Sequence, residues 1–375
     1  MSGSAPPIVL LTTQNFPPDK GGIQTLMGGL AKSLAKAGLR VVVFADRARG
    51  PAPATPGYET RRFGGPKPLR RIRKALALRR AMRDPAVIGV FADTWKSLEW
   101  LPPPRLPVAV LAHGMEFPDR ASPRKLARLR RALSRASAVV AVSRYAADLA
   151  RPYVDAARQR LTVINNPILP QPAPRPDAVA EVGALLAGRH PVLLTVGRLE
   201  PRKGVDRVLR ALPALAARFP ALTYVVAGSG GDLPRLTGLA REYGVESRVI
   251  FLGDTPDATR TALYTAADIF VMPARREGNS VEGFGIVYLE AAWHGLPSIA
   301  GTEGGAADAV EDGRTGLLCD GADPAAVEAA LMALLQDDAR RQAMGEAAAA
   351  HVRQNQLWDA AVPRYLALLR SPSET

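Results

Sequence analysis

Residues 267–301 read ADIFVMPARREGNSVEGFGIVYLEAAWHGLPSIAG, and this stretch decides the class of fold. The apolar runs at its two ends, 267–273 and 296–301, are typical of short buried strands. Between them, apolar residues keep the spacing of one helix face over 286–293, and Gly295 is a natural helix stop. Strand, loop, helix and strand in this order predict parallel strands joined by a crossover helix.

The same alternation runs through the whole chain of 375 residues. We expect strands at 8–12, 39–45, 108–112 and 138–143 in the first half, and at 191–197, 222–228, 248–253, 267–273 and 296–301 in the second. Between the halves, the segment 166–177 carries five prolines, which favour an extended spacer. We therefore predict two doubly wound α/β domains, 1–168 and 169–355, and expect a terminal helix at 356–375 that packs back on the first.

The composition excludes several classes of protein. With 47% hydrophobic and 22% charged residues the chain can bury sizeable cores, so it is not mainly disordered. One cysteine, Cys319, excludes an internal disulfide framework and a thiolate zinc cluster. The four histidines show no metal-ligand spacing, so no metal is expected. The first residues lack a basic segment followed by a long apolar run, so we expect no signal peptide and no membrane span.

The net charge of +14 is distributed very unevenly. Residues 1–170 hold 29 Lys and Arg against 10 Asp and Glu, a balance of +19, and residues 171–375 hold 20 against 25, a balance of −5. The segment 61–83 has ten basic residues and no acidic one, and 122–135 has six more basic residues. This excess predicts contact with a polyanion, either nucleic acid or the anionic face of a membrane, through the first half only. A solvated basic face without a partner remains the alternative.

The expected helix at 286–293 offers a site for a phosphate group. Gly283 and Gly285 precede it, so backbone N–H groups at its start are bare and the positive end of the helix dipole is exposed. Glu290 lies about one turn inside the helix and suits the two adjacent hydroxyls of a ribose, while Glu282 lies just before the helix. Two solvated glutamates are the alternative interpretation.

The loop after the expected strand at 191–197 carries two cations that could bind a phosphate group. GRLEPRKG, residues 197–204, holds Arg198 and Lys203, which could bind one polyanion together. The alternative interpretation is a solvated basic loop without a ligand.

Three further positions follow expected strands. Gly21 and Gly22 in the first such loop allow close approach of a ligand to the backbone. Gly230 lies in the GSGGD turn that follows the strand at 222–228, and His113 ends the strand at 108–112. An ordinary glycine turn and a solvent-facing imidazole are the alternatives for these positions.

Taken together, these motifs resemble the retaining family-four glycosyltransferases of the GT-B fold, in which two Rossmann-like domains face each other across a cleft. The resemblance rests on GGIQT near the start, HG at 113–114, GRLEPRKG, and the pair Glu282 and Glu290 within EGFGIVYLEA. The long loop PARREGNSVEGFG is similar to that of phosphatidylinositol mannosyltransferases and related mannosyl enzymes.

The resemblance implies a metal-independent transfer, without a cofactor, of a hexose from a GDP- or UDP-linked donor, with mannose favoured and glucose possible. It implies that Arg198 and Lys203 neutralise the diphosphate, that Glu290 holds the ribose and that Glu282 contacts the hexose. The remaining donor contacts that we expect are His113, Gly21, Gly22, Gly230, and the backbone around Phe284, Gly285, Ile286 and Val287.

In this family the first half of the chain holds the acceptor. The resemblance therefore implies that the basic segments dock on an anionic membrane surface near that acceptor. We expect a lipid-linked or glycan acceptor and a peripheral cytoplasmic enzyme on the inner face of the membrane, without nucleic acid as a partner. Two alternatives stay open, namely a nucleotide-sugar epimerase of the same fold and a basic nucleic-acid-binding protein. The second of these would leave Glu282, Glu290 and Arg198 without a role.

Overall fold

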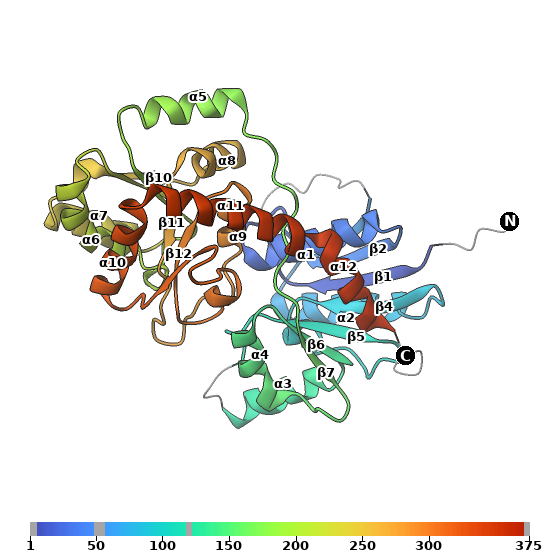
Figure 1. Cartoon of the computed structure of the whole chain (residues 1–375). Helices are drawn as coiled ribbons and strands as arrows, with labels where there is room; N and C mark the ends of the chain where they lie inside the picture. Colours follow the sequence, from blue (N-terminus) through green and yellow to red (C-terminus); the bar gives the residue numbers. More distant parts are fainter. Residues whose placement is uncertain (1–5, 49–56, 118–121, 371–375) are drawn as a thin grey trace. The chain divides into compact units, whose positions relative to one another are not determined.

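The computed structural model describes residues 6–48, 57–117 and 122–370, and its chain divides into two compact units (Figure 1). The first unit is Met1–Leu169 with Leu357–Thr375, and the second is Pro170–Gln356. Each unit is an α/β domain with one parallel sheet, so the prediction of two α/β domains of the doubly wound type is confirmed.

The first unit is built on a seven-stranded parallel sheet in the order β3-β2-β1-β4-β5-β6-β7. Its strands are β1 (Ile8–Thr13), β2 (Arg40–Asp46), β3 (Glu59–Phe63), β4 (Val87–Ala92), β5 (Val108–Ala112), β6 (Ala138–Ala141) and β7 (Arg160–Val163). Leu10 in β1 pairs with Val42 on one side and with Val90 on the other. The strand order therefore reverses between β1 and β4, which is the switch point where ligands of such sheets bind.

Helices and a returning C-terminal segment cover this sheet. The helices are α1 (Gly22–Lys36), α2 (Lys67–Ala81), α3 (Pro123–Leu133), α4 (Arg144–Ala150) and α12 (Trp358–Leu366). Helix α12 packs against α1, and the Trp358 indole fills the space beside Gly29, where a Cβ would lie 2.4 Å from the indole nitrogen. The terminal helix is shorter than the 356–375 expected, because the chain tightens into a 3-10 turn at Ala367–Leu369. Residues 371–375 lie outside the described part.

The second unit has a six-stranded parallel sheet in the order β10-β9-β8-β11-β12-β13. Its strands are β8 (Val192–Val196), β9 (Thr223–Ala227), β10 (Val249–Gly253), β11 (Ile269–Met272), β12 (Ser298–Gly301) and β13 (Gly316–Cys319). All five strands expected in this half are present, and β13 is additional. Leu194 in β8 pairs with Val225 and with Phe270 of β11, so the switch point of this sheet lies between β8 and β11.

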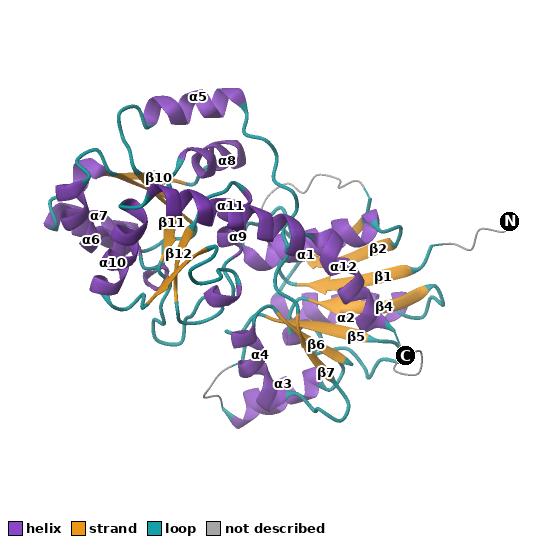
Figure 2. Ribbon diagram, in the orientation of Figure 1, coloured by secondary structure: helices purple, strands orange, loops and turns teal. Residues whose placement is uncertain are grey.

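Helices cover both faces of the second sheet (Figure 2). One apolar cluster joins the sheet to α6 (Val205–Arg218), α7 (Leu233–Glu242), α10 (Pro324–Leu335) and α11 (Asp338–Asn355). The other joins it to α5 (Pro176–Leu185), α8 (Asp257–Ala266) and α9 (Ile286–Trp293). This three-layer packing leaves the loops after β8 and β11 at the carboxyl end of the sheet, side by side.

Candidate active site

The loop after β8 brings a group of cations to the switch point of the second sheet. A 3-10 turn at Pro201–Lys203 directs Arg202 and Lys203 inward, and their side chains are 15% and 11% exposed. Arg198, by contrast, is 66% exposed and pairs with Glu200 at 3.4 Å. Arg202 also pairs with Glu200, at 2.9 Å. Of the two cations predicted from the sequence, Lys203 is therefore buried and Arg198 faces solvent.

Glu282, in the loop after β11, is the partner of the two buried cations. Its Oε2 accepts a hydrogen bond from Lys203 Nζ and another, at 2.6 Å, from Arg202 Nη1. Burial alone would raise the pKa of Glu282, but the positive charges of Lys203 and Arg202 outweigh this effect and lower the pKa to about 2. The carboxylate is therefore ionised at neutral pH and joins two loops that are 79 residues apart in sequence.

The ion-pair cluster formed by these two loops keeps a net positive charge. Arg198, Arg202 and Lys203 provide three cations, whereas Glu200 and Glu282 provide two carboxylates. A phosphate group that approached this cluster would meet charge-assisted donors already held in place.

Helix α9 begins directly beside Glu282. Gly285 is its N-cap, with φ of 89°, and a Cβ there would lie 2.5 Å from the Tyr288 ring and 3.6 Å from Glu282 Cγ. No side chain caps this end. The Tyr288 N–H donates to the Gly285 carbonyl at 3.0 Å, whereas the N–H groups of Ile286 and Val287 have no hydrogen-bond partner among the described residues. Phe284 is buried and anchors the turn, and the two residues that open the helix, Ile286 and Val287, are half-buried. The helix end thus supplies N–H donors next to the cation cluster.

Glu290 lies one turn inside α9 and is half-buried. Its Oε2 accepts a hydrogen bond from the Tyr264 hydroxyl of α8 at 3.0 Å. Burial raises the pKa of Glu290 above its ordinary value, although the charge of Arg260 and the Tyr264 hydrogen bond oppose this shift. Tyr264 thus orients the Glu290 carboxylate, which the sequence analysis predicts to bind a ribose.

The turn after β9 is tied to the loop after β8. Leu199 N–H donates to the Ser229 carbonyl at 2.9 Å, and a Cβ at Gly230 would lie 2.2 Å from the Leu199 carbonyl oxygen. Only glycine allows this approach without a shift of the backbone. Gly230 therefore helps to shape the loop that carries Lys203.

In the first unit, the predicted residues lie at the carboxyl ends of β1 and β5. Gly21 is the N-cap of α1, and Gly22 is the first residue of that helix. His113 follows β5 and is half-buried; its Nε2 lies 2.8 Å from the backbone carbonyl oxygen of Asp93, and its backbone N–H donates to Glu116 at 2.6 Å.

The sequence interpretation missed several residues of these clusters. Arg202 lies within GRLEPRKG, but nothing in the loop sequence indicates which of its two arginines turns inward. Arg275 in the β11–α9 loop makes a buried two-pronged ion pair with Asp206 of α6, at 2.9 and 3.1 Å, and its backbone N–H donates to the Arg202 carbonyl. This pair fixes the two loops against each other and had no signal in the sequence, because its members are 69 residues apart.

Two other kinds of feature are absent from the part of the chain that the structure describes. Over residues 6–48, 57–117 and 122–370, no group of three or more His, Cys, Asp or Glu side chains has the arrangement of a metal site. Within the same ranges, every helix is too short or too polar to span a bilayer.

Two Rossmann-like domains, the second with cations and bare helix amides at its switch point, define an enzyme of the nucleotide-sugar-dependent GT-B class. Comparison with known families agrees. A family described as "Glycosyl transferases group 1" matches residues 183–351, and "Glycosyltransferase Family 4" matches residues 20–171.

Individual relatives extend this match along the chain. A "GDP-mannose-dependent alpha-(1-6)-phosphatidylinositol monomannoside mannosyltransferase" from Mycolicibacterium smegmatis is 32% identical over 98% of this chain and 99% of its own. The protein of the same description from Mycobacterium tuberculosis is 32% identical over 96% of this chain and 98% of its own. The chain therefore belongs to glycosyltransferase family 4, and the resemblance inferred from the motifs is confirmed.

Solved structures show the same fold. Sucrose-phosphate synthase from Thermosynechococcus elongatus superposes with a TM-score of 0.78, at 24% identity, over 97% of this chain and 98% of its own. HepE of Anabaena, in complex with UDP and glucose, gives a TM-score of 0.75 at 21% identity, over 97% and 99% of the two chains. The protein is thus a glycosyltransferase of the GT-B fold that uses a nucleotide sugar.

Proposed function

We propose that this enzyme transfers mannose from GDP-mannose, with retention of the anomeric configuration and without a metal ion, to a lipid-linked or glycan acceptor. The observation that carries the proposal is the pair of buried cations, Arg202 and Lys203, beside the uncapped start of α9. The choice of GDP-mannose over a UDP-linked sugar is supported by the names of relatives that are 32% identical over nearly the whole chain.

The reaction breaks the bond between C1 of the sugar and the β-phosphate oxygen, and the electron pair leaves with the phosphate. A new bond forms between C1 and an acceptor hydroxyl on the same face of the sugar, and the hydroxyl proton passes to a phosphate oxygen of the departing GDP. Negative charge therefore grows on the phosphate in the transition state. Fixed cations and helix amides stabilise a transition state most where such charge develops, by about 2.7 to 4 kcal/mol for one donor.

The residues predicted from the sequence have these roles in the proposal. Lys203 and Arg198 neutralise the diphosphate, Arg202 assists Lys203, and the amides at Phe284–Val287 bind phosphate or sugar oxygens. Glu282 contacts the hexose and Glu290 holds the ribose, with Gly230 shaping the adjacent loop. His113, Gly21 and Gly22, which lie in the first unit, are the remaining proposed contacts to the donor.

A panel of nucleotides tests the donor assignment. Thermal unfolding is measured with GDP, UDP and ADP, and we expect GDP to raise the melting temperature most. Glu290→Ala, which removes the proposed ribose contact, should abolish most of the GDP shift, whereas Glu246→Ala, a solvent-exposed control in the same unit, should keep it. A larger shift with UDP than with GDP would refute the mannose donor.

Transfer itself is followed with GDP-mannose and membrane lipid extract. Product NMR should show the α-anomer, and EDTA should leave the rate unchanged. A β-linked product would exclude retention, and loss of activity in EDTA that Mg²⁺ restores would exclude a metal-independent mechanism.

We further propose that the first unit docks on the anionic inner face of the membrane through α2. Leu69, Ile72 and Leu76 follow helical spacing on this helix and are 53%, 38% and 58% exposed, which is unusual for large apolar side chains. Beside them is a hollow of about 570 Å³ that is lined by Phe63, Arg73, Leu76, Ala77, Arg79, Arg80 and Arg83. Exposed apolar side chains flanked by cations are typical of helices that lie in the interface of an anionic leaflet.

Vesicle flotation tests the docking. The protein should float with vesicles that contain anionic lipid and stay behind with neutral ones, and the double variant R79E/R80E should lose most of this binding. Arg210→Glu, on an exposed position of α6 in the second unit, is the control. Equal binding to neutral and anionic vesicles would refute the proposal.

A further inference from the structure

We infer that Asp93 is a positioning residue that holds His113 in the Nε2–H tautomer, so that Nδ1 is the atom that accepts a hydrogen bond from a substrate hydroxyl. The inference about the tautomer stands on the geometry of the first unit. The role of Nδ1 toward a sugar or acceptor hydroxyl rests on the proposed function.

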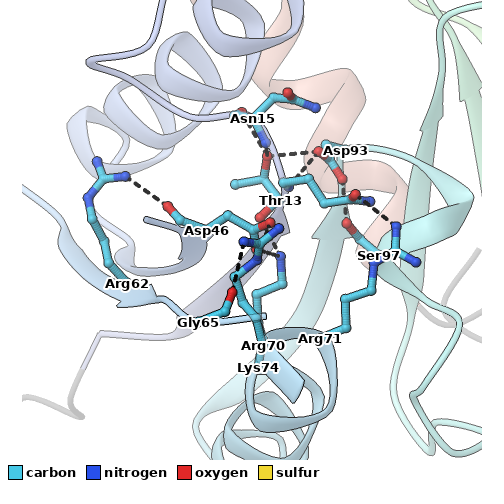
Figure 3. A network of polar contacts seen from close by, with 11 residues as sticks. Thr13, Asn15, Asp46, Arg62, Gly65, Arg70, Arg71, Lys74, Asp93 and Ser97 are labelled. Carbon is cyan, nitrogen blue, oxygen red and sulfur yellow. Dashed lines mark hydrogen bonds and ion pairs between the residues drawn. The ribbon is translucent and has the colours of Figure 1, made fainter. Parts of the chain in front are cut away.

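Asp93 directly follows β4, at the switch point of the first sheet, and it is completely buried. One carboxylate oxygen, Oδ2, lies 2.8 Å from the backbone N–H of Gln14 and 2.9 Å from the Thr13 hydroxyl. The other, Oδ1, accepts from the Ser97 hydroxyl at 2.6 Å. Figure 3 shows the Thr13 and Ser97 side chains turned toward this carboxylate. Both oxygens thus face donors, as an ionised carboxylate requires.

The Thr13 hydroxyl is itself fixed. It accepts from the backbone N–H of Asn15 at 2.9 Å, so its own proton points to the Asp93 carboxylate or to the Asn15 carbonyl at 2.8 Å. The carboxylate is the stronger acceptor because it is charged. On the other side of Thr13, the buried Lys74 of α2 donates to its carbonyl at 2.6 Å and pairs with Asp46 at 2.7 Å (Figure 3). The end of β1 is therefore held from β4 and from α2.

The backbone of Asp93 connects this network to His113. Its N–H donates to the Thr12 carbonyl at 3.0 Å, and its carbonyl oxygen lies 2.8 Å from His113 Nε2. A carbonyl can only accept, so Nε2 must carry a proton. In the neutral ring Nδ1 then has the lone pair, and over the described residues no hydrogen bond to Nδ1 is found.

Two more contacts fix the backbone around His113. Glu116 Oε1 accepts from the His113 backbone N–H at 2.6 Å, and the Glu116 carbonyl accepts from the Trp95 indole at 3.2 Å. Asp93 therefore links the carboxyl ends of three adjacent strands, β1, β4 and β5, and its backbone carbonyl orients the His113 ring. Loss of the Asp93 side-chain contacts would leave the backbone bond to Thr12 as the remaining contact that positions the Asp93 carbonyl against Nε2.

Nitrogen NMR of the histidine rings tests the tautomer directly in the full chain. The His113 signals are assigned by their absence in His113→Gln, and the spectra are recorded at a pH where the ring is neutral. We expect the Nε2–H pattern in the wild type. The Nδ1–H pattern, or an equal mixture of both, would overturn the inference regardless of any activity.

Asp93→Asn tests the positioning. The amide offers one acceptor oxygen where three donors converge, so the ring should become a mixture of tautomers. We expect kcat to fall about 10- to 100-fold, as for a misplaced contact group, while the KM for the nucleotide sugar changes little. Asp84→Asn, the same substitution at an exposed position of this unit, should change neither value.

If Asp93→Asn fails to fold, Ser97→Ala is used, because it removes one donor only. It should shift the tautomer ratio and kcat in the same direction by a smaller factor. Unchanged ring signals and unchanged kcat in the folded variant would overturn the positioning role. If no donor supports transfer but the ring behaves as described, the proposed function fails and the tautomer assignment stands.

Discussion

Replacing Glu282 with Gln keeps the shape of the side chain and removes the charge that Arg202 and Lys203 share. The pKa of this carboxyl is lowered from 4.5 to about 2, and a pKa difference of one corresponds to about 1.4 kcal/mol. The folded protein therefore favours the ionised form by about 3 kcal/mol relative to the unfolded chain. The side chain is only 12% exposed, so solvent screens this interaction weakly.

The sign of the pH dependence follows from the lowered pKa. The stabilisation is fully present above about pH 4.5 and is lost as the pH falls toward 2. Glu282→Gln should lower the free energy of unfolding by about 3 kcal/mol at neutral pH, and the gap to the wild type should narrow below about pH 4.5.

Urea denaturation of the full chain at several pH values measures this difference. Glu200→Gln is the matched control, since Glu200 contacts the same Arg202 but is 31% exposed, and it should cost less than about 1 kcal/mol. If Glu282→Gln were as stable as the wild type at neutral pH, or if the gap did not change in acid, the ion-pair cluster would not have the energy assigned to it here.

Two further substitutions and one measurement of thiol reactivity have specific expected outcomes. Gly230→Ala should lower both the melting temperature and the affinity for GDP, measured by calorimetry, because its Cβ would lie 2.2 Å from the Leu199 carbonyl oxygen; normal GDP binding would contradict the role of this turn. Arg275→Met leaves Asp206 without its two-pronged partner and should cost about 3 kcal/mol in urea denaturation; a loss below about 1 kcal/mol would show that the remaining arginines compensate. Burial raises the pKa of Cys319 to about 12, so a thiol reagent at mildly alkaline pH should react with the folded protein much more slowly than with the unfolded chain, and equal rates would refute its burial.

The sequence predicts the buried strands well and the edge strands poorly, for a physical reason. β8 and β9 are covered on both faces, so they read as continuous apolar runs. β3 (ETRRF) and β7 (RLTV) are the two edges of the first sheet, lie partly in solvent and carry polar residues, so they have no such run. β4 (VIGVFA) is central and apolar, and the strands expected from the sequence do not include it in spite of that pattern.

For the site, the sequence predicts the glycine-flanked start of α9 and the basic loop after β8, because both are local patterns. It does not predict that Glu282 pairs with Lys203, since that contact depends on strand order: β8 and β11 are neighbours in the sheet but not in the chain. It also does not distinguish Arg198 from Arg202, because a single 3-10 turn decides which side chain is buried. The roles given to all the site residues, Lys203, Glu282 and Glu290 included, remain predictions.

The return of α12 to the first unit has a consequence for how the protein is made. On the ribosome, residues 357–370 emerge only after the whole second unit has been synthesised. Until then the surface beside Gly29 lacks the Trp358 indole that covers it, so the nascent first unit exposes apolar area. The second unit is continuous in sequence, so its fold does not need residues 357–370. A chain that lacks residues 357–375 should therefore bind a chaperone more strongly than the full chain.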